Sequence, residues 1–269
     1  MRASRSLQFT VAALAVWQIL AAGLSTSGVL PGDDVGTISD RYDSWIDPAG
    51  YAFSIWGVIY LASLVLAAYQ VRADRAADPV LTGLRVPLAV AFTLNGVWII
   101  AFQQEQFALS QVIIVALTAA LAIGYLRLAR AGRPRTRAER WIVYATTGLY
   151  LGWGTVATVA GFSTTTLALG VTSLGLPTQV WAVAVLIVAG GIVAAIVAAG
   201  PPEPGFPLAT SWALTAIAVN QAGPRPIVAT VAGLAAAAAI IAFIIRERRW
   251  NKVGGAIADR EDDPLPSPV

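Results

Sequence analysis

The sequence predicts an all-α fold, a polytopic membrane helical bundle of about eight transmembrane helices. Three observations lead to this class. First, the chain of 269 residues is 57% hydrophobic and only 12% charged, which is about half the charge of a typical soluble domain. Second, its apolar stretches are about as long as a bilayer crossing requires. Third, its basic residues gather at alternate loops between those stretches. A multi-pass membrane protein explains all three.

The apolar segments define the expected helices in order. They fall at residues 8–25, 49–70, 84–102, 107–128, 141–160, 178–199, 206–222 and 226–245. The first segment follows basic residues, as a signal peptide would, but we interpret it as a retained helix. The seventh is short and lies between "GPPEPGFP" and "NQAGPRP", so a full span and a re-entrant segment both remain open.

The distribution of basic residues fixes the expected topology. With eight spans, sixteen of the eighteen Lys and Arg residues lie on one side, the exceptions being Arg41 and Arg225. Positive charge marks the cytoplasmic side of membrane proteins. Both termini are therefore predicted to be cytoplasmic. The tail at 250–269 is acidic and rich in proline towards its end, and we expect it to be disordered and cytoplasmic.

Missing residue types exclude several chemistries. The chain has no Cys and no His, and its only Met is the initiator. This argues against soft metal sites, Cys nucleophiles, Ser–His–Asp catalysis and axial ligation of haem. The one lysine, Lys252, lies beyond the last apolar segment and cannot form an intramembrane Schiff base. We predict no catalytic residue, no metal site, no required cofactor and no nucleic-acid partner, so the protein is not expected to be an enzyme.

Three segments share one aromatic spacing. The sets are Phe53, Trp56 and Tyr60; Asn95, Trp98 and Phe102; and Tyr150, Trp153 and Ala157. Residues spaced i, i+3 and i+7 lie on one face of a helix. Trp56 lies roughly 12 Å inside its helix at 1.5 Å per residue, although tryptophan prefers the headgroup region. The faces serve either helix packing or a ligand site, and Asn95 either bonds a neighbouring helix or points into that site.

These segments also resemble a known family. "DPAGYAFSIWGVIYLASLVLAAYQ", "LNGVWIIAF" and "LYLGWGTVATVAG" are similar to the tryptophan-rich sensory proteins, the TspO/MBR or translocator-protein-like family. The resemblance rests on W-x3-Y at Trp56 and Tyr60, on L-N-x2-W ending at Trp98, and on Y-x2-W-x3-A from Tyr150 to Ala157. It covers residues 8 to 160.

The resemblance implies a fold, a site and a ligand class. Residues 1–160 would form a five-helix core whose outer half encloses a pocket for a porphyrin- or sterol-like ligand. Loop 26–47, with Tyr42 and Trp45, would be its lid, and 161–249 would add three transmembrane helices. The expected location is the bacterial plasma (inner) membrane. The implied ligand-binding residues are Phe53, Trp56, Tyr60, Asn95, Trp98, Tyr150, Trp153 and Ala157.

The chain also departs from the family pattern. Gly161 stands where the family usually has Asn, and Gly148 and Leu149 stand where it has a proline before the tyrosine. The chain also continues for three more helices. Within them, "WALTAIAVN" at 212–220 shares W-x3-A-x3-[GN] with "WGTVATVAG" at 153–161, which is either a repeat of the motif or a coincidence in an alanine-rich chain.

Three functional hypotheses follow. The first is a membrane receptor or sensor that binds a planar hydrophobic small molecule in the aromatic pocket. The alternative is a small-molecule transporter or efflux protein without an intramembrane proton-coupling residue, since no ionisable group lies within the apolar cores. The third is a scaffold whose last three helices dock a partner membrane protein. The ligand, the signalling output and the oligomeric state, including a homodimer, remain open.

Overall fold

The computed structural model describes residues 2–42, 44–170, 175 and 177–261. Over these residues the chain is helical and contains no strand. Its eight long helices are α1 (Arg2–Thr26), α3 (Ile55–Val71), α4 (Pro79–Gln103), α5 (Phe107–Ala131), α6 (Ala145–Ala168), α7 (Thr178–Ala199), α8 (Gly205–Gln221) and α9 (Pro226–Glu261). Shorter elements are α2 (Val35–Arg41), the 3-10 turns η1 (Gly50–Ser54) and η2 (Ala73–Arg75), and a π-helical turn, η3 (Glu139–Tyr144), which leads into α6. The predicted helical bundle is confirmed.

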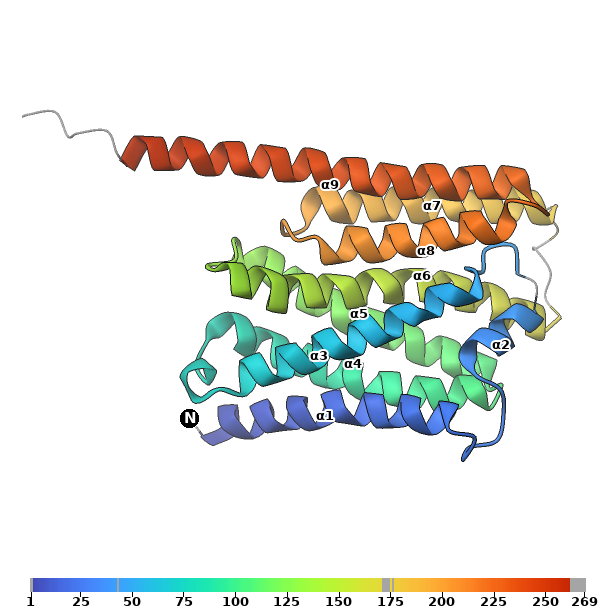
Figure 1. The fold of residues 1–269 in the computed structure, drawn as a ribbon, viewed down its shortest axis with the longest axis horizontal. Coiled ribbons are helices and arrows are strands. Elements are labelled where there is room, and N and C mark those ends of the chain that lie inside the picture. Colours follow the sequence, from blue (N-terminus) through green and yellow to red (C-terminus); the bar gives the residue numbers. More distant parts are fainter. Residues whose placement is uncertain (1, 43, 171–174, 176, 262–269) are drawn as a thin grey trace, which may run out of the picture.

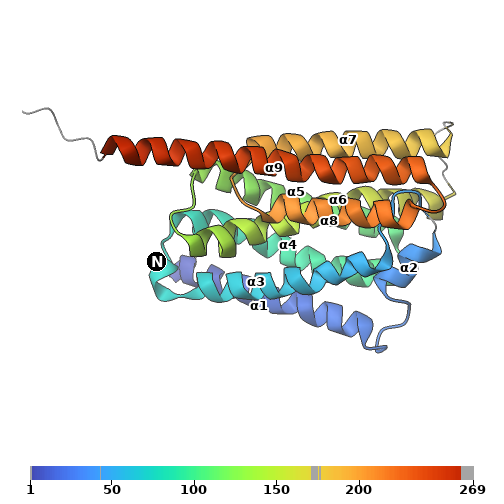
Figure 2. The same cartoon turned by 45° about the horizontal axis from the view of Figure 1, so that its top comes forward.

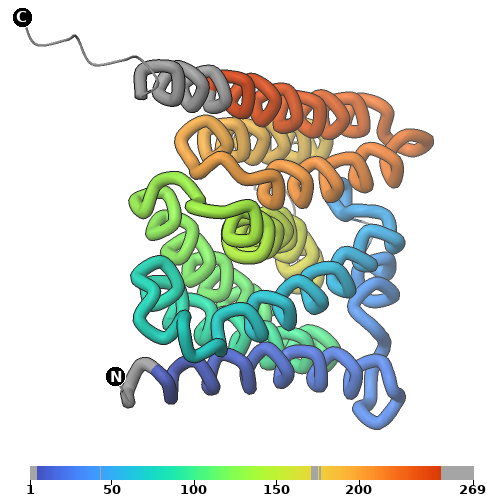
Figure 3. Tube along the Cα trace, turned by 60° about the vertical axis from the view of Figure 1, so that its left-hand side comes forward, coloured from blue at the N-terminus to red at the C-terminus, as the bar shows by residue number. Residues whose placement is uncertain are grey.

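The long helices run side by side along one axis, with the start of α1 and the end of α9 at the same end (Figures 1 and 2). α1 packs against α3 and α4, α4 packs against α5, and α5 packs against α6. The last three helices form a further layer, in which α8 contacts α6, and α9 contacts both α7 and α8. Figure 3 shows α6 between the two groups. α6 therefore joins the expected core to the last three helices.

Six of the described helices are long and apolar enough to cross a membrane by length and composition. The two predicted spans outside this set are α6 and α8. α8 has only 17 residues, and α6 is rich in glycine and threonine, with most of its side chains buried against protein. A helix that faces protein instead of lipid does not need a uniformly apolar surface. The composition of these two helices reflects their interior position beside the other six.

Glycines allow α6 and α8 to approach closely. A Cβ atom on Gly205 would lie 1.9 Å from the carbonyl oxygen of Ala145, and one on Gly152 would lie 2.7 Å from that of Phe206. Gly148, which replaces a proline expected from the resemblance, leaves room for the buried carboxyl of Glu203. Small residues at helix interfaces are typical of membrane bundles. α8 is thus built into the bundle.

Two helices extend beyond the boundaries that we expected. α6 continues through residue 160 to Ala168. In this threonine-rich stretch, hydroxyl groups can bond back to the helix, as Thr164 does to the carbonyl of Ala160 at 3.3 Å. α9 continues to Glu261, into the tail for which we expected disorder from residue 250, because each added residue extends the existing hydrogen-bond ladder. The rest of that tail, 262–269, lies outside the described residues.

Candidate functional site

The tryptophans of three helices meet at one point, at the end of the bundle away from the N-terminus. Trp56 of α3 lies at the centre of this aromatic cluster. Its ring centroid is 5.7 Å from that of Trp98 on α4, 6.1 Å from that of Trp153 on α6 and 5.9 Å from that of Tyr150. Tyr60 stacks on it at 5.6 Å, with an interplanar angle of 24°. The spacing in the sequence therefore placed these rings correctly on facing surfaces.

Phe53 and Phe92 complete the cluster on either side. Phe53, in η1, contacts Trp153 edge-on at 5.8 Å. Phe92 of α4 stacks on Tyr150 at 6.2 Å and was not among the residues expected at the site. It lies three residues before Asn95, so the same helical face would have indicated it. Each such aromatic pair contributes about 0.5–1.5 kcal/mol beyond the burial of its area.

Polar groups beneath the rings are only partly satisfied. The Tyr60 hydroxyl donates to Asn95 Oδ1 at 3.3 Å, and the Tyr150 hydroxyl donates to Gln18 Oε1 on α1 at 3.0 Å. Asn95 Nδ2, Gln18 Nε2 and Trp153 Nε1 are buried and have no hydrogen-bond partner. An orphaned buried donor costs about 1–3 kcal/mol, so each of these groups requires a structural or functional explanation. Gln18 was not foreseen, because its helix carries no part of the aromatic motif.

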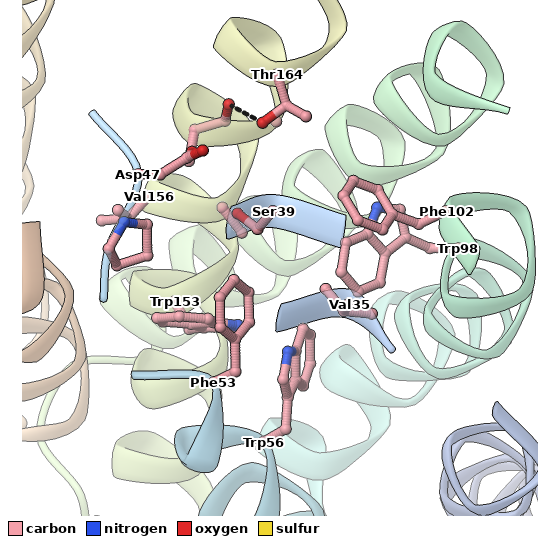
Figure 4. Close-up of a pocket in the computed structure, with 14 residues that line it drawn as sticks. Val35, Ser39, Asp47, Phe53, Trp56, Trp98, Phe102, Trp153, Val156 and Thr164 are labelled. Atoms are coloured by element: carbon pink, nitrogen blue, oxygen red, sulfur yellow. Dashed lines mark hydrogen bonds between the residues drawn. The ribbon is translucent and has the colours of Figure 1, made fainter. Parts of the chain in front are cut away.

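A small cavity lies on the α6 side of Trp56 (Figure 4). Five of the eight expected ligand-binding residues line it: Phe53, Trp56, Trp98, Trp153 and Ala157. Gly161, where the family pattern has Asn, lines it as well. Its volume is about 30 Å³, enough for one or two water molecules. The cavity does not have room for a porphyrin or a sterol as it stands.

A larger groove lies on the other side of Trp56, between α1 and α3. Its volume is about 360 Å³. Tyr60, Trp56, Phe53 and Trp98 line this groove. On the other wall, α1 contributes small residues such as Gly23. The two spaces share three aromatic side chains and Val35 of α2. Of the eight expected residues, Asn95 and Tyr150 line neither space and lie among the packed side chains below.

The helix α2 closes the site from the outside. Asp34 caps its N-terminus: the carboxylate accepts hydrogen bonds from the amides of Gly36 and Thr37 and from the Thr37 hydroxyl at 2.6 Å. The hydrogen bond from the Thr37 hydroxyl, followed by those from the two amides, lowers the pKa of Asp34. Ile38 is fully buried, and Val35 and Ser39 point between Trp98 and Trp153 in Figure 4. Loop 26–47 is thus an inserted cover that fills much of the space beside the tryptophans.

The two expected lid aromatics hold this cover at its edges and line neither space. The ring of Tyr42 contacts that of Phe107 edge-on at 5.0 Å, and burial, followed by the nearby Glu105 carboxylate, raises the pKa of its hydroxyl. Trp45 lies under the guanidinium of Arg225, 4.7 Å from its ring centroid. Arg41 pairs with Glu105 at 2.6 Å, and this bond raises the pKa of Arg41.

α8 holds the chain between this cover and α3. Trp212 Nε1 donates to the carbonyl of Ala52 at 3.0 Å, and Asn220 Nδ2 donates to the carbonyl of Asp47 at 3.1 Å. The carbonyl of Ala216 accepts from the amide of Ala49 at 3.2 Å. The three positions of W-x3-A-x3-N in α8 therefore all bond the segment that leads into the aromatic site, and none of them lines the cavity.

Among the described residues, no group of three or more His, Cys, Asp or Glu side chains could hold a metal ion. The cluster offers a set of aromatic faces and a few buried hydrogen-bond donors beneath the helix α2. Such an arrangement can bind a flat apolar molecule.

Comparisons with known proteins identify a family for most of the chain. A protein-family model described as TSPO-like protein matches residues 8–245. The match begins in α1 and ends in α9, so it includes the helices after residue 160. Searches of curated proteins and of solved structures gave no match.

Proposed function

The chain belongs to the TSPO-like protein family, and on that basis we propose that it is a receptor or sensor for a planar hydrophobic small molecule. The family indicates a membrane sensor or binding protein in general and is generally non-enzymatic. The chain is a multi-pass membrane protein whose apolar helices contact the lipid bilayer. The proposal adds the ligand class, porphyrin- or sterol-like, and the aromatic cluster around Trp56 as its site.

One observation carries the proposal. Trp153 is only 1% exposed, lines the small cavity, and has an indole N–H without an acceptor. Tryptophan is a hydrogen-bond donor only. A ring kept purely for packing would be expected to bury an apolar edge or to bond a carbonyl. We infer that the ligand combines a flat apolar ring system with a hydrogen-bond acceptor that reaches this N–H.

Binding requires the cover to move. Ligand sites for molecules of this size occupy about 300–1,000 Å³, whereas the cavity beside Trp153 holds about 30 Å³. Displacing Val35 and its neighbours on α2 would join that cavity to the groove of about 360 Å³ beside α1. The ligand would then lie against Trp56, Trp98 and Trp153 together. Movement of α2 would also give the receptor a signal at the membrane surface.

The charge distribution supports an orientation with both termini in the cytoplasm of a bacterial cell. The start of α1 and the end of α9 lie at one end of the bundle, and the basic loop after α5, with Arg127 and Arg140 near its limits, lies at that end too. By the positive-inside rule this end is cytoplasmic. The aromatic site would then open towards the outer leaflet.

A fluorescence titration tests the proposal. The purified full-length chain is titrated with protoporphyrin and, separately, with a sterol while tryptophan emission is recorded. The wild type is compared with a Trp56→Leu, Trp153→Leu double variant and with Trp141→Leu, which removes a ring that is 58% exposed and lies in η3, at the other end of the bundle. We expect saturable quenching in the wild type and in Trp141→Leu, and its loss in the double variant. Equal affinity in all three proteins, or quenching that never saturates with either ligand, would overturn the proposal.

A further inference from the structure

A second pocket lies at the opposite end of the bundle from the aromatic site. It has a volume of about 380 Å³ and lies where α4 begins and α5 ends. Its walls are Pro79, Val80 and Gly83 on α4, Arg127 and Ala131 on α5, and Arg133 and Arg135 in the following loop. Three of the seven lining residues are therefore arginines, and none is acidic. This is a basic pocket at the surface of the membrane region.

One of the three pocket arginines is paired with carboxylates that do not line the pocket. Arg135 forms ion pairs with Asp78 and with Glu139, each at 2.7 Å, so two carboxylates compensate its charge. Asp78 also caps α4 by accepting from the amides of Val80 and Leu81. The Nη1 of Arg127 donates to the Gly83 carbonyl across the pocket at 2.6 Å. The pocket therefore presents three arginines and no acidic side chain to a ligand.

Exposed apolar side chains lead away from this pocket into the membrane-spanning part. On α4 they are Val86 and Val90, three and seven residues after Gly83, which places them on its face. On α5 they are Leu126 and Ile123, the latter four residues before Arg127. α4 and α5 pack against each other, and we call these four exposed side chains the apolar strip. A molecule that fits pocket and strip is anionic at one end and apolar along its length.

We propose that this pocket binds the phosphate headgroup of an anionic phospholipid, with its acyl chains along the strip on α4 and α5. Arginine guanidinium groups bind phosphate oxygens with paired, charge-assisted hydrogen bonds. A soluble phosphate would use the arginines alone, whereas the lipid also covers the exposed apolar side chains. The proposal does not depend on the aromatic site or its ligand.

Lipid binding to the detergent-solubilised full-length chain, measured by native mass spectrometry, tests this. The probes are phosphatidylglycerol and, as the neutral comparison, phosphatidylcholine. The test variant is Arg127→Gln, Arg133→Gln. The matched control is Arg130→Gln, Arg137→Gln, which removes the same charge from exposed positions that do not line the pocket. Because the test variant loses the charge-assisted hydrogen bonds that would hold the phosphate in the pocket, it should bind phosphatidylglycerol at least about tenfold more weakly. The control should stay within about twofold of the wild type.

A steric variant separates the site from charge and from folding. Gly83→Leu keeps every arginine and has room at its first carbon, because the nearest atom to a Cβ there is Arg127 Cδ at 3.9 Å. Its longer side chain should fill the pocket and weaken phosphatidylglycerol binding about as much as the double variant does. Equal losses in the test and control variants would mean diffuse attraction and overturn the site, as would no loss in either. Displacement of the lipid by millimolar inorganic phosphate would overturn the lipid as occupant in favour of a free anion.

Discussion

Replacing Asn220 with alanine tests whether α8 keeps the cover closed over the aromatic site. Asn220 Nδ2 donates to the carbonyl of Asp47, the last residue of loop 26–47, at 3.1 Å. A hydrogen bond of this kind contributes about 0.5–1.5 kcal/mol. Its loss should therefore raise the open fraction of the cover by about 2- to 12-fold. Because the closed cover leaves only about 30 Å³ beside Trp153, closure and ligand binding compete.

The unusual consequence is that removing a contact should tighten binding. Protoporphyrin should bind Asn220→Ala about 2- to 12-fold more tightly than the wild type, with a faster association rate. Stopped-flow and equilibrium quenching of tryptophan emission measure both quantities. The matched control is Ser211→Ala on the same helix, which removes a buried hydrogen bond to the carbonyl of Ala236 on α9 at 3.2 Å. Weaker or unchanged binding by Asn220→Ala, or equal tightening in Ser211→Ala, would refute a cover held by α8.

Three further predictions follow from single positions. Burial raises the pKa of Glu203 from 4.5 to about 8. The protonated carboxyl therefore contributes its full stability below pH 4.5, and up to about 5 kcal/mol of folding free energy is lost as the pH rises through 8. Over this pH range the thermal midpoint of Glu203→Gln should fall less than that of the wild type. Parallel falls of the two midpoints with pH would contradict the raised pKa of Glu203. Gly205→Ala should lower the thermal midpoint by an amount equivalent to about 1–3 kcal/mol, because its Cβ would meet the Ala145 carbonyl. The control Gly233→Ala should leave the midpoint unchanged, because the nearest atom to its Cβ, Ala218 Cβ, is 3.9 Å away. Equal midpoints of the two variants would show that α6 and α8 are not in close contact. Trp153→Phe should weaken protoporphyrin binding about tenfold, as for one hydrogen bond and a smaller ring, and unchanged affinity would mean that the indole N–H does not contact the ligand.

The aromatic cluster could be predicted because it depends on local periodicity. The i, i+3, i+7 spacing places Phe53, Trp56 and Tyr60 on one face whatever the rest of the fold does. The same holds for Trp98 and Trp153, and the shared depth of the three tryptophans follows from the alternation of the helices. For Asn95, the structure agrees with the interhelical bond, since its Oδ1 accepts from Tyr60. Its unpartnered Nδ2 leaves the polar interpretation open to test.

The resemblance implied a lid over residues 26–47, but the helix α2 within it and its support by α8 could not be predicted from the sequence. α2 has only seven residues, too few for a periodic signal, and the burial of Ile38 depends on the helices that it enters. The role of α8 was equally hidden. Its W-x3-A-x3-N pattern resembled the motif of α6, yet Trp212 and Asn220 bond a loop more than 150 residues earlier. No local pattern records a contact at that separation.

The most direct test of the central claim is hydrogen–deuterium exchange of the full-length chain with and without saturating protoporphyrin. We expect the amides of α2, Val35–Arg41, to exchange faster when the ligand is bound, because the ligand displaces this helix. The amides around Phe53 and Trp56 should exchange more slowly, because the ligand covers them. Slower or unchanged exchange in α2, at ligand concentrations that saturate the fluorescence change, would contradict a site that opens by displacement of its cover.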